Sequence, residues 1–177
     1  GGLSGGDYNF SGNPSGKNNN NSKNNKDEES WFERQYKDHQ HWLAMDKESV
    51  SEYLDWLNDA YQRAYAEGII DLDEYYKYQE EVYQGIQDLF KDHINDIDHD
   101  VSMLEAGVGN SDEIIGLYLQ AMQDIEKELQ AARDAGLDEN GDYIQWLEQQ
   151  WLNYSENVTD LREQAETEAQ SSIDDLV

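Results

Sequence analysis

The placement of proline and glycine constrains this chain more than any other feature. From Lys26 to the end of the 177 residues there is no proline, and the glycines are confined to a few short segments. Because Pro and Gly are the residues that most strongly interrupt helices, the stretches between these glycines are free to form long helices. We therefore expect an all-α fold in which Gly-punctuated turns join successive helices into αα-hairpins or an elongated bundle.

Apolar residues between the glycines recur at steps of three or four, which places them on one face of each helix. The spacing predicts helices over about 27–45, 49–67, 72–105, 111–135 and 140–170, with the last dozen residues fraying. The expected apolar stripes are Val50, Leu54, Leu57, Tyr61 and Ala64; Tyr75, Tyr78, Val82, Ile86, Phe90, Ile94, Ile97, Val101 and Leu104; Ile115, Tyr118, Met122, Ile125, Leu129 and Ala132; and Tyr143, Leu147, Trp151, Tyr154, Val158, Leu161 and Ala165. Upstream, a shorter opening helix is marked by Trp31, Phe32, Tyr36, Trp42, Leu43 and Met45.

The helix ends carry recognisable signals. Gly68 and Gly136 follow the last apolar residue of a stripe and are expected to adopt the left-handed conformation that ends many helices. Asp71 or Asp73 is the expected N-cap of the helix after Gly68, and Ser111 that of the helix near 111. The stripe over 111–135 steps alternately by three and four, which predicts coiled-coil-like packing.

An internal echo of 68 residues separates Gly68 from Gly136. Each glycine follows an alanine by four residues, and aromatic residues stand seven and ten residues after each of them. This pattern predicts two copies of an αα-hairpin repeat. Similarity elsewhere is weak, so two hairpins that converged on the same turn remain the alternative.

Residues 1–26 differ from the rest in composition. They are rich in Gly, Asn and Ser, contain the single proline, Pro14, and have almost no apolar side chains. Such a segment cannot offset the entropy of ordering, so we predict a disordered linker ahead of a helical hairpin region at 27–177. The start lacks the basic and apolar stretches of a signal peptide, and we interpret the chain as a piece of a longer protein.

Charge and cysteine content exclude several function classes. Forty acidic residues oppose 12 basic ones, giving a formal charge of −28, which repels phosphate backbones. We expect no direct nucleic-acid binding. The apolar runs are too short for a transmembrane helix, so no membrane contact is expected from this segment. Without Cys there is no disulfide and no thiolate metal site.

Two spacings resemble metal sites. The acidic turn around Gly141 evokes a calcium loop, but placing this glycine sixth puts Gly136 first and Leu147 twelfth, where oxygen ligands are required. An acidic turn that caps the next helix explains the same residues. The pairs Asp38 with His41 and Asp96 with His99 share a helix face, as in di-iron bundles. Those bundles use the longer Glu, and neighbouring aspartates favour a polar face instead.

Catalytic signatures are also missing. The sequence has no Gly-x-Ser-x-Gly elbow and no phosphate-binding loop, and in so acidic a chain neighbouring carboxylates carry no information. Tyr and Trp stripes at helical spacing favour a core or a partner interface over a carbohydrate platform. We expect that the chain is not an enzyme and has no catalytic, cofactor-binding or metal-ligating residues and no cofactor.

An ordered set of short motifs across residues 31–155 resembles a helical segment of tail tape measure proteins from phages and prophages of Gram-positive bacteria. The motifs are Trp31-Phe-Glu, Tyr36, His39-x-His41, Met45-Asp46-x-Glu48, Tyr53-x-x-Trp56-Leu57, Ala60-Tyr61, Ala64-Tyr65, Gly68, Leu72-Asp73, Tyr75-Tyr-Lys-Tyr78, Glu80-Glu-Val-Tyr83, Gly85, Leu89-Phe-Lys-Asp92, Gly136-Leu-Asp138, Asp142-Tyr-Ile144 and Trp151.

The resemblance implies a structural role in virion assembly. A tape measure protein lies in the tail-tube lumen, sets tail length, and is present in the host cytoplasm during assembly. The implied partners are proteins: further copies of itself, tail-tube proteins, tail chaperones and tail-tip proteins. Full tape measure proteins are longer and generally include a membrane-active stretch, which this segment lacks.

Two other function classes remain open on the sequence. An acidic helical repeat of a bacterial surface or secreted protein that binds a protein partner fits the same composition. A metal-dependent helical enzyme fits poorly, and stoichiometric metal in the purified protein would be needed to revive it.

Overall fold

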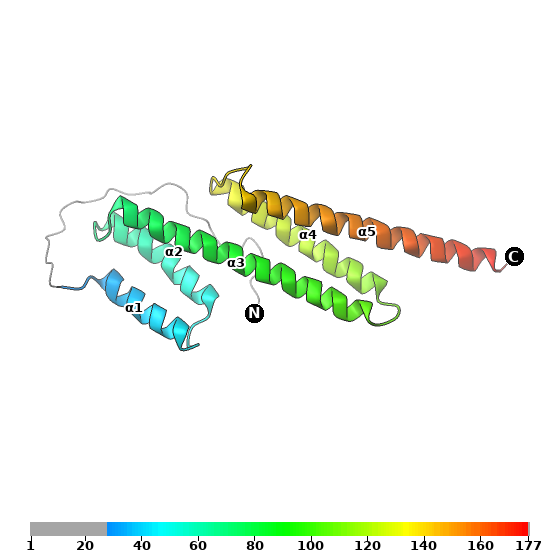
Figure 1. Cartoon of the computed structure of the whole chain (residues 1–177), viewed down its shortest axis with the longest axis horizontal. Coiled ribbons are helices and arrows are strands. Elements are labelled where there is room, and N and C mark those ends of the chain that lie inside the picture. Colours follow the sequence, from blue (N-terminus) through cyan, green and yellow to red (C-terminus); the bar gives the residue numbers. More distant parts are fainter. Residues whose placement is uncertain (1–27, 177) are drawn as a thin grey trace. The chain divides into compact units, whose positions relative to one another are not determined.

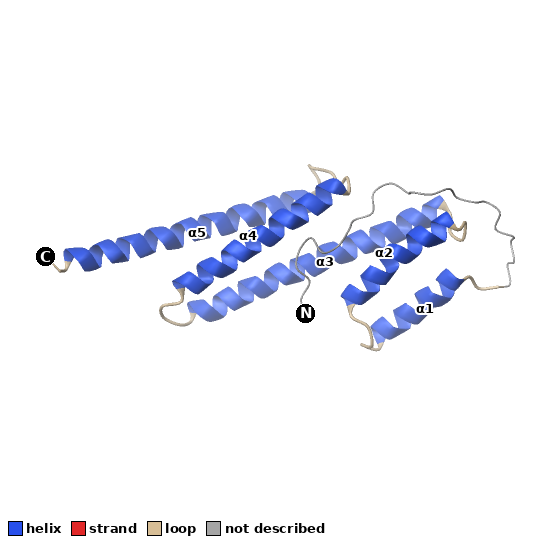
Figure 2. Ribbon diagram, turned by 180° about the vertical axis from the view of Figure 1, so that it is seen from behind, coloured by secondary structure: helices blue, strands red, loops and turns tan. Residues whose placement is uncertain are grey.

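The computed structural model describes residues 28–176, and everything described is helix or connecting turn, which confirms the predicted all-α class (Figures 1 and 2). The predicted linker over residues 1–26 lies outside the described residues. The helices are α1 (Trp31–Ala44), α2 (Val50–Ala66), α3 (Leu72–Glu105), α4 (Ser111–Asp134) and α5 (Asp142–Asp174).

The helix boundaries follow the glycine punctuation closely, and α3 coincides with the range 72–105 expected from the sequence. The C-terminal end differs. Fraying was expected over the last dozen residues, but α5 continues to Asp174. The stretch contains no Gly or Pro, and adding residues to a helix that has already formed costs far less than starting one, so α5 propagates without a buried face.

The contacts of the described residues divide into two units, one formed by residues 28–89 and one by residues 90–176. We call them the N-terminal unit and the C-terminal unit. The 34-residue helix α3 contributes residues to both. Each unit therefore contains three helical segments.

In the N-terminal unit, α2 runs antiparallel to the first part of α3. Tyr61 lies against Tyr75, with ring centroids 4.9 Å apart, and Leu54 packs over Gly85 farther along. A Cβ at Gly85 would lie 2.6 Å from Leu54, so this glycine permits a close helix–helix approach. The third helix, α1, is the short opening helix that the sequence predicts, and Phe32 is its buried residue.

In the C-terminal unit, α4 runs antiparallel to both α5 and the second part of α3. The ring of Tyr118 on α4 lies 5.4 Å from that of Tyr154 on α5, and His93 on α3 bonds Asp124 on α4. The buried face of α3 is continuous from Tyr75 to Val101 at the predicted positions. The middle helix of each unit is thus antiparallel to its two neighbours.

The two predicted glycine turns have the same geometry. Gly68 and Gly136 adopt φ values of 75° and 81°. In each turn the glycine N–H donates to a carbonyl three residues back, and the next N–H donates to the alanine carbonyl, with Ile69 to Ala64 at 2.9 Å and Leu137 to Ala132 at 3.0 Å. These paired bonds define a Schellman motif. The echo of 68 residues is therefore a repeated helix end.

The restart after each turn is not repeated. After Gly68 the chain re-enters a helix at Leu72, capped reciprocally by Asp71 and Glu74, whose side chains accept from each other's backbone N–H at 2.8 and 3.3 Å. After Gly136 a longer turn delays α5 until Asp142. The second turn therefore departs from a strict repeat.

Two details of α4 correct the sequence expectations. The N-cap is Asn110, not Ser111, and the Asn110 side chain donates to the Leu104 carbonyl instead of capping α4. The buried face also begins one residue earlier than predicted, with Ile114 and Ala121 buried while Ile115 and Met122 are half-buried; the coiled-coil prediction is left without a test. None of the described helices is long and apolar enough to span a membrane.

Candidate functional site

The histidine–aspartate pairs singled out as metal candidates do not form sites with additional ligands. Asp38, His41, Asp96 and His99 are all exposed. Across residues 28–176 no three His, Asp or Glu side chains are grouped so that they could hold a metal ion. That the chain binds no metal stays a prediction from the sequence.

The turn that evoked a calcium loop is closed by its own hydrogen bonds. The Asp138 carboxylate accepts from the Asn140 N–H at 3.0 Å, and the Asp138 carbonyl accepts from the Gly141 N–H at 2.9 Å. Glu139 pairs with Arg133 at 2.7 Å. Gly141 is the N-cap of α5 and provides no side-chain bond, so the acids shape the turn but do not cap the helix.

The other two histidines lie between helices and contact carboxylates. His39 lies 2.7 Å from Glu48, and its ring stacks on Trp56 with centroids 4.0 Å apart. In the C-terminal unit His93 Nε2 lies 2.8 Å from Asp124. The stacking of His39 on Trp56 joins α1 to α2, Glu48 lies in the turn between these two helices, and the His93–Asp124 contact joins α3 to α4.

Glu81 is the centre of a polar cluster inside the N-terminal unit. Tyr53 donates its hydroxyl proton to Glu81 at 2.7 Å and Tyr36 does so at 3.1 Å, while Gln40 donates to the Tyr53 hydroxyl. Burial, with the negative charge of Glu81 adding to it, raises the pKa of both tyrosines. The cluster joins α1, α2 and α3.

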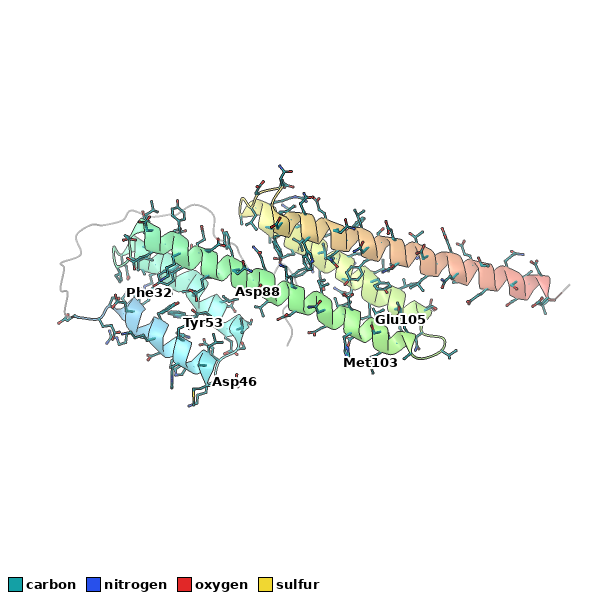
Figure 3. All side chains as sticks on the ribbon, viewed as in Figure 1. Phe32, Asp46, Tyr53, Asp88, Met103 and Glu105 are labelled. Atoms are coloured by element: carbon teal, nitrogen blue, oxygen red, sulfur yellow. The ribbon has the colours of Figure 1, made fainter. Side chains whose placement is uncertain are left out.

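Aromatic packing surrounds this cluster. Phe32, the buried residue of α1, lies edge-on to Tyr78 with centroids 4.9 Å apart and stacks on Trp56 at 6.1 Å (Phe32 and Tyr53 are labelled in Figure 3). Burial raises the pKa of Tyr78 to about 12. The rings fill the interior and hold α1, which would otherwise have little apolar surface to bury.

The C-terminal unit buries two carboxylates one helical turn apart on α4. Asp124 and Glu128 are each 2% exposed. Asp124 contacts His93 and accepts from Gln120 at 2.9 Å, and Glu128 accepts from the Tyr143 hydroxyl at 2.8 Å. Burial and the negative charge of Glu128 raise the pKa of Tyr143. Buried charges require such donors to remain in a core.

A fourth tyrosine–carboxylate bond joins α5 to α3. Tyr154 donates to Asp98 at 2.6 Å, and burial followed by this bond raises the pKa of Tyr154. The sequence pattern placed Tyr143 and Tyr154 on apolar stripes, but it did not identify Tyr53 or the acidic partners of these tyrosines. The signal was present on α4, where Asp124 and Glu128 stand at core spacing beside Ile125 and Leu129.

The far end of α5 differs from the rest of the C-terminal unit. Tyr118 on α4 faces Tyr154, so the start of α4 at Ser111 corresponds to Leu161 on α5. Asp98 on α3 also bonds Tyr154, and α3 runs parallel to α5, so Glu105 at the end of α3 lies level with Leu161 as well. From residue 162 onward α5 extends past the turn that joins α3 and α4 (Figures 1 and 2).

We call residues 162–176 the α5 extension. Every residue of the extension is exposed. Two shallow depressions in the described surface lie along α5 at this end, and the first is lined by Asp160, Glu163, Gln164, Thr167 and Glu168. These are open faces of one helix, so they suit contact with another macromolecule better than enclosure of a small substrate.

Comparison with known proteins gives no relative for the chain. No family model, curated protein or solved structure matches it.

Proposed function

We propose that this chain is a structural segment of a phage tail tape measure protein, acting in tail assembly and length determination inside the tail tube. The observation that supports the proposal most directly is the use of α3. This single 34-residue helix, which advances about 51 Å at 1.5 Å per residue, supplies the third helix of one unit and the first of the next. A helix of this length suits a structural segment.

The internal chemistry is consistent with a structural role. The tyrosine contacts described above join helices at Glu81, Glu128 and Asp98, and the contact of His93 joins two helices at Asp124. The polar groups thereby fix which helices pair and in what register, which is the best-attested use of buried polar residues.

Deleting the codons for residues 28–176 from the parent gene tests the proposal. Fully extended, about 150 helical residues would account for about 225 Å of tail, whereas folded-back hairpins account for about a fifth of that. We expect shortened tails in electron micrographs of purified virions, with normal length restored when the intact gene is supplied. Detection of the segment in virions by mass spectrometry should accompany the length change.

Tails of unchanged length, together with absence of the segment from virions, would refute the assignment. If the protein were instead found on the surface of uninduced bacterial cells by protease shaving, the acidic surface-protein reading would replace it. The exposed acidic helices are compatible with that second reading, since the formal charge of −28 suits a solvated surface.

A further inference from the structure

The α5 extension continues the buried face of α5 without a helix to cover it. At 100° per residue, Ala165, Ala169 and Ile173 fall within an arc of about 80° that also contains Val158, which is buried against the rest of the unit. The stripe is therefore continuous with an established helix–helix interface. It ends in open solvent.

Large apolar side chains are exposed at this end of the C-terminal unit. Ile173 is 56% exposed and Leu176 is 86% exposed, and Val108, in the turn between α3 and α4, is fully exposed. Met103 near the end of α3 is 65% exposed (labelled in Figure 3). Val108 and Met103 lie on other elements, and exposed apolar residues scattered singly need no explanation. Ile173, in contrast, continues the buried stripe of α5, and this continuity marks a contact surface.

The charge of the extension selects the kind of partner. Acidic side chains border the apolar stripe on both sides, with Glu168 and Asp175 on one side and Glu166 on the other. The extension has five acids and one base, Arg162. A second copy of this chain would bring charge of the same sign, so mutual repulsion disfavours it.

We infer that the α5 extension binds an amphipathic helix that carries an apolar stripe flanked by Lys or Arg. The stripe packs on Ala165, Ala169 and Ile173, where the alanines allow close approach, and the basic flanks lie against the acidic borders. The recognition is of the helix-on-helix kind, in which the apolar stripes of two amphipathic helices pack against each other. The inference stands independently of the tail assignment, because it rests on the surface of α5 alone.

Binding of a designed peptide to the full chain tests the inference. The probe is a labelled 18-residue helical peptide with a Leu stripe and Lys flanks, and the comparison peptide has Glu in place of each Lys. Fluorescence anisotropy should show saturable binding of the Lys peptide, weakened by added salt, and no binding of the Glu peptide.

A matched pair of variants locates the surface. Ile173→Glu places a charge in the stripe, whereas Leu152→Glu makes the same kind of change at a site of similar exposure, 50%, before the extension on the same helix. We expect Ile173→Glu to raise the Kd of the Lys peptide by about tenfold and Leu152→Glu by less than about twofold. Unchanged helical circular dichroism shows that both variants are folded.

Two outcomes would overturn the inference. Equal weakening of the Lys peptide by both variants, or by neither, would reduce the interaction to nonspecific attraction by the acidic chain. A dimer in sedimentation experiments that Ile173→Glu dissociates, but Leu152→Glu does not, would assign the surface to a second copy instead.

Discussion

Removal of one hydroxyl group from the C-terminal unit gives the sharpest test of how this acidic chain stabilises its core. Tyr143→Phe deletes the donor that lies 2.8 Å from the Glu128 carboxylate, and both residues are buried, at 7% and 2% exposure. A hydrogen bond to a charged group contributes about 1.5–3 kcal/mol, and the deletion leaves a carboxylate buried with one donor fewer. We expect the free energy of unfolding to fall by about 2 kcal/mol.

Tyr118→Phe is the matched control. Tyr118 has the same exposure of 7% and lies in the same unit, and within the described part of the chain its hydroxyl does not bond a carboxylate. The identical chemical change should therefore cost less than about 0.5 kcal/mol, as expected where no special interaction is removed. Urea unfolding followed by circular dichroism at 222 nm measures both variants, and the slope of the transition should stay constant.

A double-mutant cycle separates the bond from other effects of the substitution. When Glu128→Leu is combined with Tyr143→Phe, the buried charge and its donor leave together, and replacing both partners by apolar groups is often nearly neutral. We expect a coupling energy of at least about 1 kcal/mol between the two positions. A coupling below about 0.5 kcal/mol, or equal losses for Tyr143→Phe and Tyr118→Phe, would show that the carboxylate bond is not what stabilises this contact.

Three further predictions follow from local geometry. Folding raises the pKa of the buried tyrosines, so the folded state favours their protonated form. The stability that this contributes should be complete below pH 10, the ordinary tyrosine pKa, and should be lost as the pH rises through the folded pKa values, about 12 for Tyr78. Loss of ellipticity should track tyrosine ionisation measured at 295 nm, and unfolding well below pH 10 would contradict this. Gly136→Ala should destabilise the protein by about 1 kcal/mol, because Gly136 has a φ of 81°. Gly116→Ala should stabilise it by up to about 1 kcal/mol, because Gly116 lies inside α4 and a Cβ there meets no atom within 4 Å. Melting temperatures of the two variants that move in the same direction would refute the contrast. Asp71→Ala should cost about 1 kcal/mol by loss of the reciprocal cap, while Asp73→Ala should cost much less; equal melting temperatures for the two variants would refute the assignment of Asp71 as the N-cap.

Much of the fold could be predicted from the spacing of the apolar residues and from the positions of the glycines. The stripe from Tyr75 to Val101 is buried at the predicted positions because its residues are large, apolar and separated by clearly polar ones. Gly68 and Gly136 end helices as expected because a left-handed φ is a local requirement that glycine meets without strain. These features depend on neighbours in sequence, so sequence reasoning reaches them.

The face of α4 that is buried could not be predicted from the spacing of its apolar residues. Ile114 and Ile115 are adjacent and equally apolar, so spacing alone cannot decide which of them faces the core. Tertiary contacts decide it, because Asp124 and Glu128 meet donors on α3 and α5 and thereby fix the rotation of α4. An acidic residue is ordinarily expected at the surface, and that expectation fails where a neighbouring helix supplies a hydrogen-bond donor, as His93 does for Asp124 and Tyr143 for Glu128.

The tyrosine–carboxylate bonds also explain how a chain with so few cations folds. Forty acids face only 12 Lys and Arg, so cations are scarce as partners for an acid in an interface. Tyr36, Tyr53, Tyr143 and Tyr154 supply neutral donors to carboxylates instead. A neutral donor satisfies the carboxylate without cancelling its charge. Folding therefore leaves the negative field of the chain largely intact, and the acidic borders of the α5 extension keep their attraction for a basic partner helix.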